Sequence, residues 1–215
     1  MNLLIARGRA NAYDRIIVTT GMYRMNMQSG KKRQILDAAK ELLLEVGYES
    51  MSPRKVLERS GAGQGSLYHH FSGKKQLTQT VLEEVAQELT DAFLAVFENE
   101  NLSPVEKIDQ YLARHRNGLV GCKLGRLSNE KAFCEDELRQ PLQEFFNFAL
   151  AEVQNQIELA VKDGSFPLET PSADIAHLIL SAIQGGYVVS KATNNDGAVN
   201  ISTQGARALL KAYQI

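Results

Sequence analysis

The chain has 215 residues, of which 44% are hydrophobic and 23% are charged, and these values are typical of a folded globular protein. No apolar run approaches the roughly 18 residues that a membrane-spanning helix needs, so the sequence excludes an integral membrane protein. Two cysteines, Cys122 and Cys134, supply neither a disulfide framework nor the four ligands of a structural zinc site. We therefore expect a cytoplasmic protein without a metal or other cofactor.

The first 28 residues differ in composition from the rest of the chain. Four arginines outweigh the single Asp14, and no helical apolar period runs through them, which predicts a loosely ordered N-terminal arm over residues 1–28. The apolar run at residues 3–6 is too short for a signal peptide, and the arginines follow it instead of preceding it. Three explanations stay open: an over-long start before an ordered chain that begins near Met25 or Met27, a basic arm that contacts DNA, or an organelle transit sequence.

Charge is distributed unevenly along the remaining sequence. Residues 31–75 hold nine basic and five acidic side chains, whereas residues 76–215 hold eleven basic and nineteen acidic ones. This pattern indicates an anion-binding module attached to a body that does not share its partner. Ordinary surface charge remains the alternative.

Three short helices are predicted in the basic segment. Apolar residues recur at intervals of four, three and four between Lys31 and Gly47, which indicates one amphipathic helix. Ser52 is placed to cap a second helix that has Pro53 at its first position and ends at the glycines from residue 61 onward. A third helix is expected from about Ser66 to Phe71.

The rest of the chain is predicted to be helical to its end, since no alternating strand pattern appears. Ser72 is expected to cap a long helix, because apolar residues at a four-residue interval continue to Phe97. Further helices are expected to begin at Ser103–Pro104, at Asp136 as a cap and at Pro171–Ser172, and the last helix is expected over about 201–213. The sequence therefore predicts an all-α chain of about nine helices, three small ones followed by a bundle.

Two helices joined by a glycine-containing turn in a basic segment form a helix-turn-helix unit, whose second helix can enter the major groove of DNA. The surrounding motif is specific: Gly47-Tyr48, Ser52 through Ser60-Gly61, Gly65-Ser66-Leu67-Tyr68-His69-His70-Phe71 and Lys74-Lys75-Gln76-Leu77. With these motifs the chain resembles the DNA-binding domain of the TetR family of repressors over about residues 31–80, and by helix count and length beyond them.

The resemblance implies a domain organisation and a function. It places a helix-turn-helix DNA-binding domain at residues 29–75 and a helical effector-binding and dimerisation domain at residues 76–215. It implies a homodimer that binds a pseudo-palindromic operator on double-stranded DNA, usually represses transcription, and is released by a small-molecule effector.

The expected DNA contacts gather on the third helix. Leu67 and Phe71 lie four residues apart and can anchor that helix, while Gln64 is long enough to reach an adenine edge. The resemblance implies that Tyr68 and His69 contact phosphates. The full expected set is Lys32, Ser52, Arg54, Gly63, Gln64, Gly65, Ser66, Tyr68, His69, Lys74 and Lys75. Two alternatives stay open, namely that Tyr68 is a core residue and that one of the two lysines is simply solvated.

We find no pattern of catalytic or metal-binding residues. His69 and His70 are adjacent, so on a helix they diverge and cannot jointly hold a metal. No serine, histidine and acid set has a recognisable spacing, so we expect no enzyme. The alternatives from other classes are a helical small-molecule-binding protein or enzyme that does not bind DNA, and a scaffold protein.

A second motif lies at residues 121–130. Its order Gly-Cys-x-x-Gly-x-Leu-x-x-Glu resembles a subset of the TetR family that includes regulators similar to NemR, AcuR and LmrA, although Lys123 and Ser128 depart from the commoner choices. Cys122 is expected at a helix entry, where amide dipoles favour a thiolate. Resemblance to NemR implies a sensor of electrophiles or oxidants, and the alternative is a small buried apolar residue.

The resemblance also assigns effector and dimer regions to the bundle. The expected effector is small and largely apolar or aromatic. Its candidate contacts, which are alternatively core residues, are Phe93, Phe97, Tyr111, His115, Leu119, Cys122, Phe145 and Phe146. Small residues would allow close helix approach across a two-fold interface at Ser181, Ala182, Gly185, Gly186 and Ser190. A kink beside the pocket is the alternative role of the two glycines.

Overall fold

The structure is a computed structural model that describes residues 30–213. Over these residues it contains eight α-helices, two short 3-10 helices and no strand, which confirms the predicted all-α class. The predicted N-terminal arm lies outside the described residues. None of the described helices is long and apolar enough to cross a membrane.

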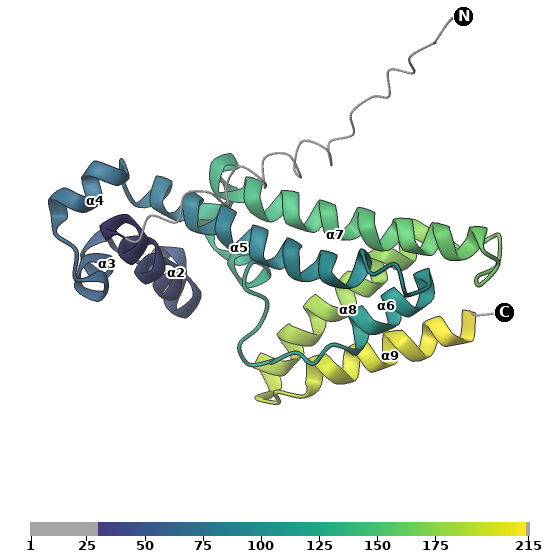
Figure 1. Ribbon diagram of the computed structural model, residues 1–215. Coiled ribbons are helices and arrows are strands. Elements are labelled where there is room, and N and C mark those ends of the chain that lie inside the picture. The colour runs from purple at the N-terminus through teal and green to yellow at the C-terminus, as the bar shows by residue number, and fades with distance from the viewer. Residues whose placement is uncertain (1–29, 214–215) are drawn as a thin grey trace, which may run out of the picture.

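Three helices form a head at one end of the molecule (Figure 1): α2 (Lys31–Ser50), α3 (Pro53–Ser60) and α4 (Gln64–His70). The Ser52 hydroxyl accepts a hydrogen bond from the amide of Lys55 and so caps α3, as predicted. Gly61 ends α3 in a left-handed conformation, with a φ of 63°, which glycine adopts without steric cost. The short turn that follows brings α4 across α2.

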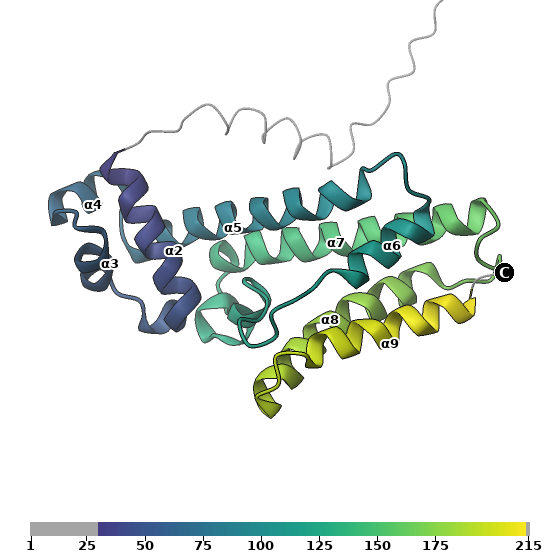
Figure 2. The same cartoon turned by 60° about the horizontal axis from the view of Figure 1, so that its bottom comes forward.

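Five longer helices form the bundle. They are α5 (Lys74–Phe97), α6 (Pro104–Ala113), α7 (Asp136–Lys162), α8 (Ser172–Thr193) and α9 (Ala198–Tyr213). Helix α5 leaves the head and runs beside α7, while α8 and α9 form an antiparallel pair, with α6 between the two layers (Figures 1 and 2). A long segment, residues 114–135, returns from the end of α6 to the head and contains the 3-10 helices η1 (Gly125–Asn129) and η2 (Lys131–Cys134).

The buried apolar residues fall into two clusters. The first joins the head to the returning segment, because Leu43 and Leu67 share it with Leu124, Leu127 and the start of α7. The second fills the bundle between α5, α6, α7, α8 and α9. Apolar packing therefore continues across the predicted domain boundary at residue 75.

Several predicted helix ends are wrong. Helix α2 continues past Gly47 to Ser50, although Gly47 interrupts its geometry with a φ of 79°. The long helix α5 begins after Gly73 and not after a Ser72 cap, because the Ser72 amide donates to the Gln76 side chain at 2.6 Å and its hydroxyl caps nothing.

Two further boundaries differ in the bundle. Glu135 occupies the position before α7, and Asp136, the expected cap, is the first helical residue with its carboxylate bound to Arg139. Helix α9 begins at Ala198 and not near residue 201. The helix expected at Cys122 is replaced by irregular chain and η1, since the segment carries no sustained apolar period.

Candidate nucleic-acid interface

Helix α4 is anchored by its apolar residues and presents its polar ones. Leu67 is fully buried and Phe71 is 3% exposed, as the four-residue spacing predicted. Gln64 and His69 are exposed, and Tyr68 is 52% exposed, which excludes the core alternative for this tyrosine. A Cβ built on Gly63 or on Gly65 would have no heavy atom within 4 Å, so the start of α4 is open to close approach.

The remaining candidate contacts differ in how accessible they are. Lys32 in the first turn of α2 and Arg54 in the first turn of α3 are exposed, and Arg54 forms an ion pair with Glu58 at 2.8 Å. The Ser52 hydroxyl is occupied as the cap of α3, and Ser66 is half-buried. Lys32 and Arg54 therefore expose their side chains to a ligand, whereas the Ser52 hydroxyl is already hydrogen-bonded to the amide of Lys55.

The two lysines that open α5 already have partners within the chain. The Lys74 ammonium lies 4.0 Å from the centre of the Tyr48 ring, and burial lowers the pKa of Lys74. Lys75 contacts the carboxylates of Glu135 at 2.8 Å and Glu137 at 3.0 Å, and these hydrogen bonds raise the pKa of Lys75 to about 12. Lys75 thus ties the start of α5 to the start of α7.

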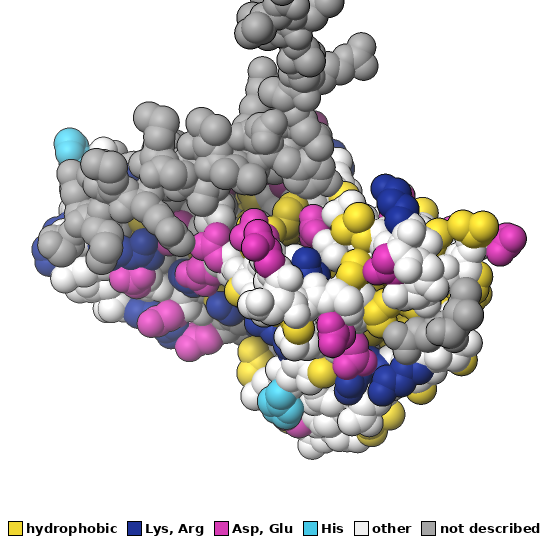
Figure 3. Space-filling view, turned by 45° about the vertical axis from the view of Figure 1, so that its right-hand side comes forward, with side chains coloured by type: hydrophobic (Ala, Val, Ile, Leu, Met, Phe, Trp, Pro, Cys, Tyr) yellow, Lys and Arg dark blue, Asp and Glu magenta, His cyan; other side chains and the backbone are white. Residues whose placement is uncertain are grey.

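Much of the positive charge of the head is paired with carboxylates. Arg33 binds Asp37 and reaches Glu84 of α5, and the guanidinium of Arg59 contacts Glu45 at 2.7 Å. On the face drawn in Figure 3, basic and acidic side chains lie next to one another. Carboxylates within the described residues therefore neutralise part of the positive charge of the head.

The sequence of the head matches that of known proteins. Residues 35–81, which cover most of the head and the start of α5, match the family described as bacterial regulatory proteins, tetR family. An uncharacterized HTH-type transcriptional regulator in the lacX 3' region of Lactococcus lactis subsp. lactis is 25% identical over 170 residues, which are 76% of this chain and 85% of the relative. The HTH-type transcriptional repressor DhaR of Mycobacterium sp. (strain GP1) is 23% identical over 76% of this chain and 84% of its own length.

The fold agrees with the sequence match. The crystal structure of E. coli NemR in its reduced form superposes with a TM-score of 0.74 and 17% identity, covering 86% of this chain and 97% of NemR. Residues 35–81 belong to the TetR family of bacterial regulatory proteins. The relatives of this chain are helix-turn-helix transcriptional regulators and not enzymes.

The expected effector contacts divide between the packed bundle and the exposed start of the returning segment. Phe93 and Phe97 are buried and stacked 4.3 Å apart, and Tyr111 and Phe148 contact Phe93. Phe145 and Phe146 are half-buried and pack against the cluster that joins the head to the returning segment. His115 and Leu119 are exposed on the returning segment, directly after α6.

A polar group adjoins the aromatic cluster, and sequence reasoning missed two of its members, Arg116 and Tyr187. Burial raises the pKa of Tyr111 and that of Tyr187, while the positive charge of Arg116 partly offsets this rise in both tyrosines. Electrostatic interaction with Cys122 raises the pKa of the same two tyrosines. Cys122 is half-buried, and its Sγ accepts the amide proton of Gly125 at 3.2 Å. Neither Arg116 nor Tyr187 stands in a motif, so only the fold brings them together.

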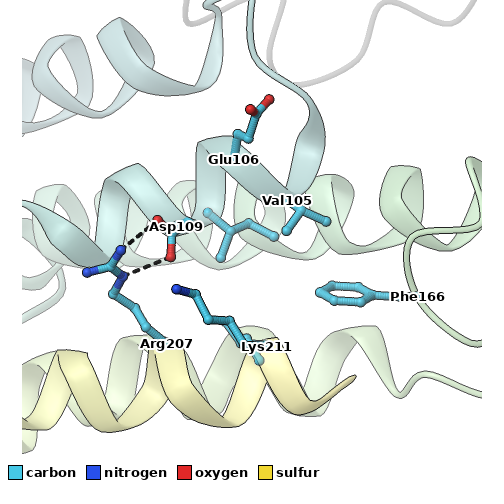
Figure 4. A pocket seen from close by; sticks show the side chains of 8 residues that line it. Val105, Glu106, Asp109, Phe166, Arg207 and Lys211 are labelled. Carbon is cyan, nitrogen blue, oxygen red and sulfur yellow. Dashed lines mark hydrogen bonds and ion pairs between the residues drawn. The ribbon is translucent and has the colours of Figure 1, made fainter. Parts of the chain in front are cut away.

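A separate cavity of about 150 Å³ lies between α6 and α9 (Figure 4). Its wall combines apolar side chains, among them Ile108 and Phe166, with the ion pair of Asp109 and Arg207. The other carboxylate in the wall, Glu106, binds Ser103 in the capping box of α6. None of the expected effector contacts lines this cavity.

The small residues of α8 lie on two different faces of that helix. Ser181 and Gly185 are exposed, and Ala182 is half-buried. Gly186 and Ser190 face α9 of the same chain, because a Cβ on Gly186 would overlap the backbone of Val199, and the Ser190 hydroxyl accepts the Val199 amide proton at 3.0 Å. Gly186 and Ser190 therefore close the α8–α9 pair within one chain.

Proposed function

We propose that this TetR-family regulator is a repressor that binds a pseudo-palindromic operator as a homodimer. Each protomer inserts α4 into the major groove, and the two helices occupy successive grooves about 34–36 Å apart. We propose residues 29–75 as the DNA-binding domain and residues 76–215 as the effector and dimerisation domain. The protein acts in the cytoplasm, where its operator lies.

One observation carries the DNA-binding proposal. The buried pair of Leu67 and Phe71 holds α4 on the head, and the same helix exposes Gln64, Tyr68 and His69 on its other side. An amide side chain can pair with an adenine edge, and hydroxyl and imidazole groups can donate to phosphates. Of the remaining candidates, Lys32 and Arg54 are exposed and supply charge at helix starts.

The test is fluorescence anisotropy on labelled duplexes, first selected from random sequence with the wild-type protein and then measured over a salt series. Gln64→Ala is expected to weaken binding to the selected duplex by about 1–3 kcal/mol and to relax the preference at one base pair. Tyr68→Phe is expected to weaken binding to all duplexes alike, because a phosphate contact carries no sequence information.

Gln110→Ala is the matched control, since this exposed glutamine lies on α6 in the bundle. It is expected to bind as the wild type does. If Gln64→Ala keeps both the affinity and the preference of the wild type, Gln64 does not read bases. If the wild type selects no duplex at low salt, the DNA-binding proposal fails.

The proposed dimer forms through α8 and α9. Their exposed face carries apolar and small side chains at helical intervals, including Leu178 and Val188 of α8 and Ile201 and Leu209 of α9, which are 52%, 65%, 64% and 60% exposed. Ser181 and Gly185 belong to this face and allow close approach of a second copy. Apolar side chains reach the surface at the bundle end in Figure 3. An exposed apolar surface of this extent is typical of an interface.

We propose that the effector is a small apolar or aromatic molecule bound beside the cluster of Phe93, Phe97 and Tyr111. The aromatic rings supply an apolar wall, and the neighbouring Arg116 and Tyr187 supply polar anchors. Only an effector with different affinities for the DNA-bound and released arrangements can shift the balance between them.

A second candidate switch is thiol chemistry at Cys122. The amide of Gly125 donates to its sulfur at 3.2 Å, and the side chain is half-buried beside the polar group of Arg116 and Tyr187. We expect Cys122→Ser to keep DNA affinity and to abolish release by N-ethylmaleimide in the anisotropy assay. Cys134→Ser is the matched control, because this cysteine is exposed, and it should release as the wild type does. Equal release of Cys122→Ser and wild type would exclude the thiol switch.

A further inference from the structure

The last turn of α2 in the head is held by two side chains from the returning segment. Glu130 Oε2 accepts the amide proton of Glu49 at 3.0 Å. The guanidinium of Arg126 donates to the carbonyl of Leu44 and lies 3.4 Å from the carbonyl of Glu45. Both contacts join residues more than 80 positions apart in the sequence. We call Arg126 and Glu130 the head clamp.

Gly47 makes room for the head clamp. Its backbone has a φ of 79° and a ψ of 175°, a conformation that is essentially restricted to glycine. A Cβ at this position would overlap the Glu130 carboxylate. The interruption in α2 and the close approach of Glu130 thus occur at the same residue.

The other side of the clamp segment is fixed in the body of the molecule. Leu124 and Leu127 are fully buried, so the backbone between them cannot shift without opening the core. Gly125 lies against α8, because a Cβ there would overlap the Gln184 side chain. The clamp therefore connects α8 to α2 through one short stretch of chain.

A second ionic contact runs parallel to the clamp. Glu88 of α5 pairs with Lys40 of α2 through one carboxylate oxygen and with Lys123 of the returning segment through the other. Burial opposes ionisation of Glu88, but the hydrogen bond and charge of Lys40 together with Lys123 lower the pKa of this carboxyl. Head, long helix and clamp segment are thus tied at one point.

We propose that Arg126 and Glu130 are positioning residues that fix the orientation of the head on the bundle, and so set the half-site spacing that the dimer accepts. This inference rests on the proposed function as a dimeric DNA-binding protein. Two heads held rigidly can engage both half-sites only when their separation and rotation match. Heads freed from the clamp would engage each half-site as before and tolerate several spacings.

The experiment uses the full chain and the operator that the wild type selects. Its two half-sites are moved apart and together by single base pairs, and anisotropy gives the affinity for each spacing and for a lone half-site. For Arg126→Ala/Glu130→Ala we expect the preference for the best spacing over its neighbours to fall by roughly 2- to 30-fold, with the half-site affinity unchanged.

Four further variants separate positioning from simple destabilisation. Glu130→Gln keeps an acceptor for the Glu49 amide and should restore the wild-type spacing profile when Arg126 is intact. Lys162→Ala and Glu100→Ala remove one charge of each sign from exposed sites at the end of α7 and in the turn after α5, and they should leave the profile unchanged. Hydrogen exchange of the Glu49 amide should be faster in Glu130→Ala and not in Glu130→Gln.

The outcomes are distinct. If the wild type selects a spaced operator and Arg126→Ala/Glu130→Ala keeps the same spacing profile, the clamp proposal is wrong while the proposed function stands. If the double variant also loses half-site affinity, the two residues merely stabilise the head, and the proposal is again wrong. If the wild type selects no duplex at all, the proposed function is wrong, and so is the clamp proposal that rests on it.

Discussion

Asp109 and Arg207 form a bidentate ion pair between α6 and α9, with nitrogen–oxygen distances of 2.8 and 2.7 Å to the two carboxylate oxygens. The hydrogen bond from Arg207 lowers the pKa of Asp109 below its ordinary value of 3.8, against the opposing effect of burial. Both side chains are partly exposed, so water screens part of the attraction. The pair therefore closes one wall of the cavity between α6 and α9 at a modest gain in stability.

The sign of the pKa shift at Asp109 gives a pH dependence. A carboxyl whose pKa is lowered by folding stabilises the fold fully above its unfolded pKa and loses that contribution as the pH falls through the folded value. We expect Asp109→Asn to lower the free energy of unfolding by up to about 1 kcal/mol at neutral pH, and we expect the difference from the wild type to shrink as the pH falls below about 4. Urea unfolding at several pH values measures this difference.

Glu100→Gln is the control for Asp109→Asn, because Glu100 is an exposed residue in the turn between α5 and α6. Its stability should follow that of the wild type at every pH. A destabilisation of Asp109→Asn that stays constant down to pH 2 would argue against the ion pair as its cause.

The sequence predicts the burial of some single residues but not their distant partners. The positions of Leu67, Phe71 and Gln64 follow from spacing on one helix, and the buried or exposed state of each agrees with that expectation. The partners of Lys75 do not follow from spacing, because Glu135 and Glu137 are some 60 residues away along the chain. Contacts between distant segments depend on the packing of whole helices, which no local pattern encodes.

Among the elements, α6 and α5 have serine starts that look alike in sequence and differ in structure. The Ser103 hydroxyl accepts the Glu106 amide proton, and the Glu106 carboxylate accepts the amide proton of Ser103, which completes a capping box. The Ser72 hydroxyl makes no such bond, because Gly73 holds the position before α5.

This difference predicts unequal effects of the same substitution. Ser103→Ala removes a cap and should lower the free energy of unfolding by about 0.5–2 kcal/mol. Ser72→Ala removes no capping bond and should have almost no effect. Thermal or urea unfolding of the two variants makes the comparison, and equal losses would mean that Ser72 does cap α5.

The sequence predicted those elements that carry a sustained apolar period. Helices α2 and α5 lie within a few residues of their predicted ranges, because their buried side chains repeat every three or four positions. Helix α3 follows instead from its Ser52 cap and from the glycine that ends it. The returning segment could not be placed in this way. Its buried residues, such as Leu124 and Leu127, are fixed by contacts with the head and the bundle and follow no helical period.

For the whole molecule, the exposed face of α8 and α9 makes a prediction about assembly. Ile201→Glu places a charge in the proposed dimer interface, where burial without a partner is costly. We expect this variant to sediment as a monomer and to lose roughly 100-fold or more in operator affinity, because one head no longer brings the second to its half-site. Analytical ultracentrifugation and anisotropy measure the two effects.

Leu168→Glu is the control for Ile201→Glu. Leu168 is 84% exposed in the connection between α7 and α8, outside the proposed interface. This variant should remain dimeric and bind DNA as the wild type does. A dimer that survives Ile201→Glu would place the interface elsewhere.

The apolar cluster that joins the head to residues 124–142 has a consequence for how this protein can be recombined. A chimera that takes the head of a relative and joins it to this bundle at residue 75 would set a foreign surface against Leu127, Phe133 and Leu142. A functional exchange must carry the returning segment along with the head. The interchangeable unit of this regulator is therefore assembled from two stretches of sequence separated by α5 and α6.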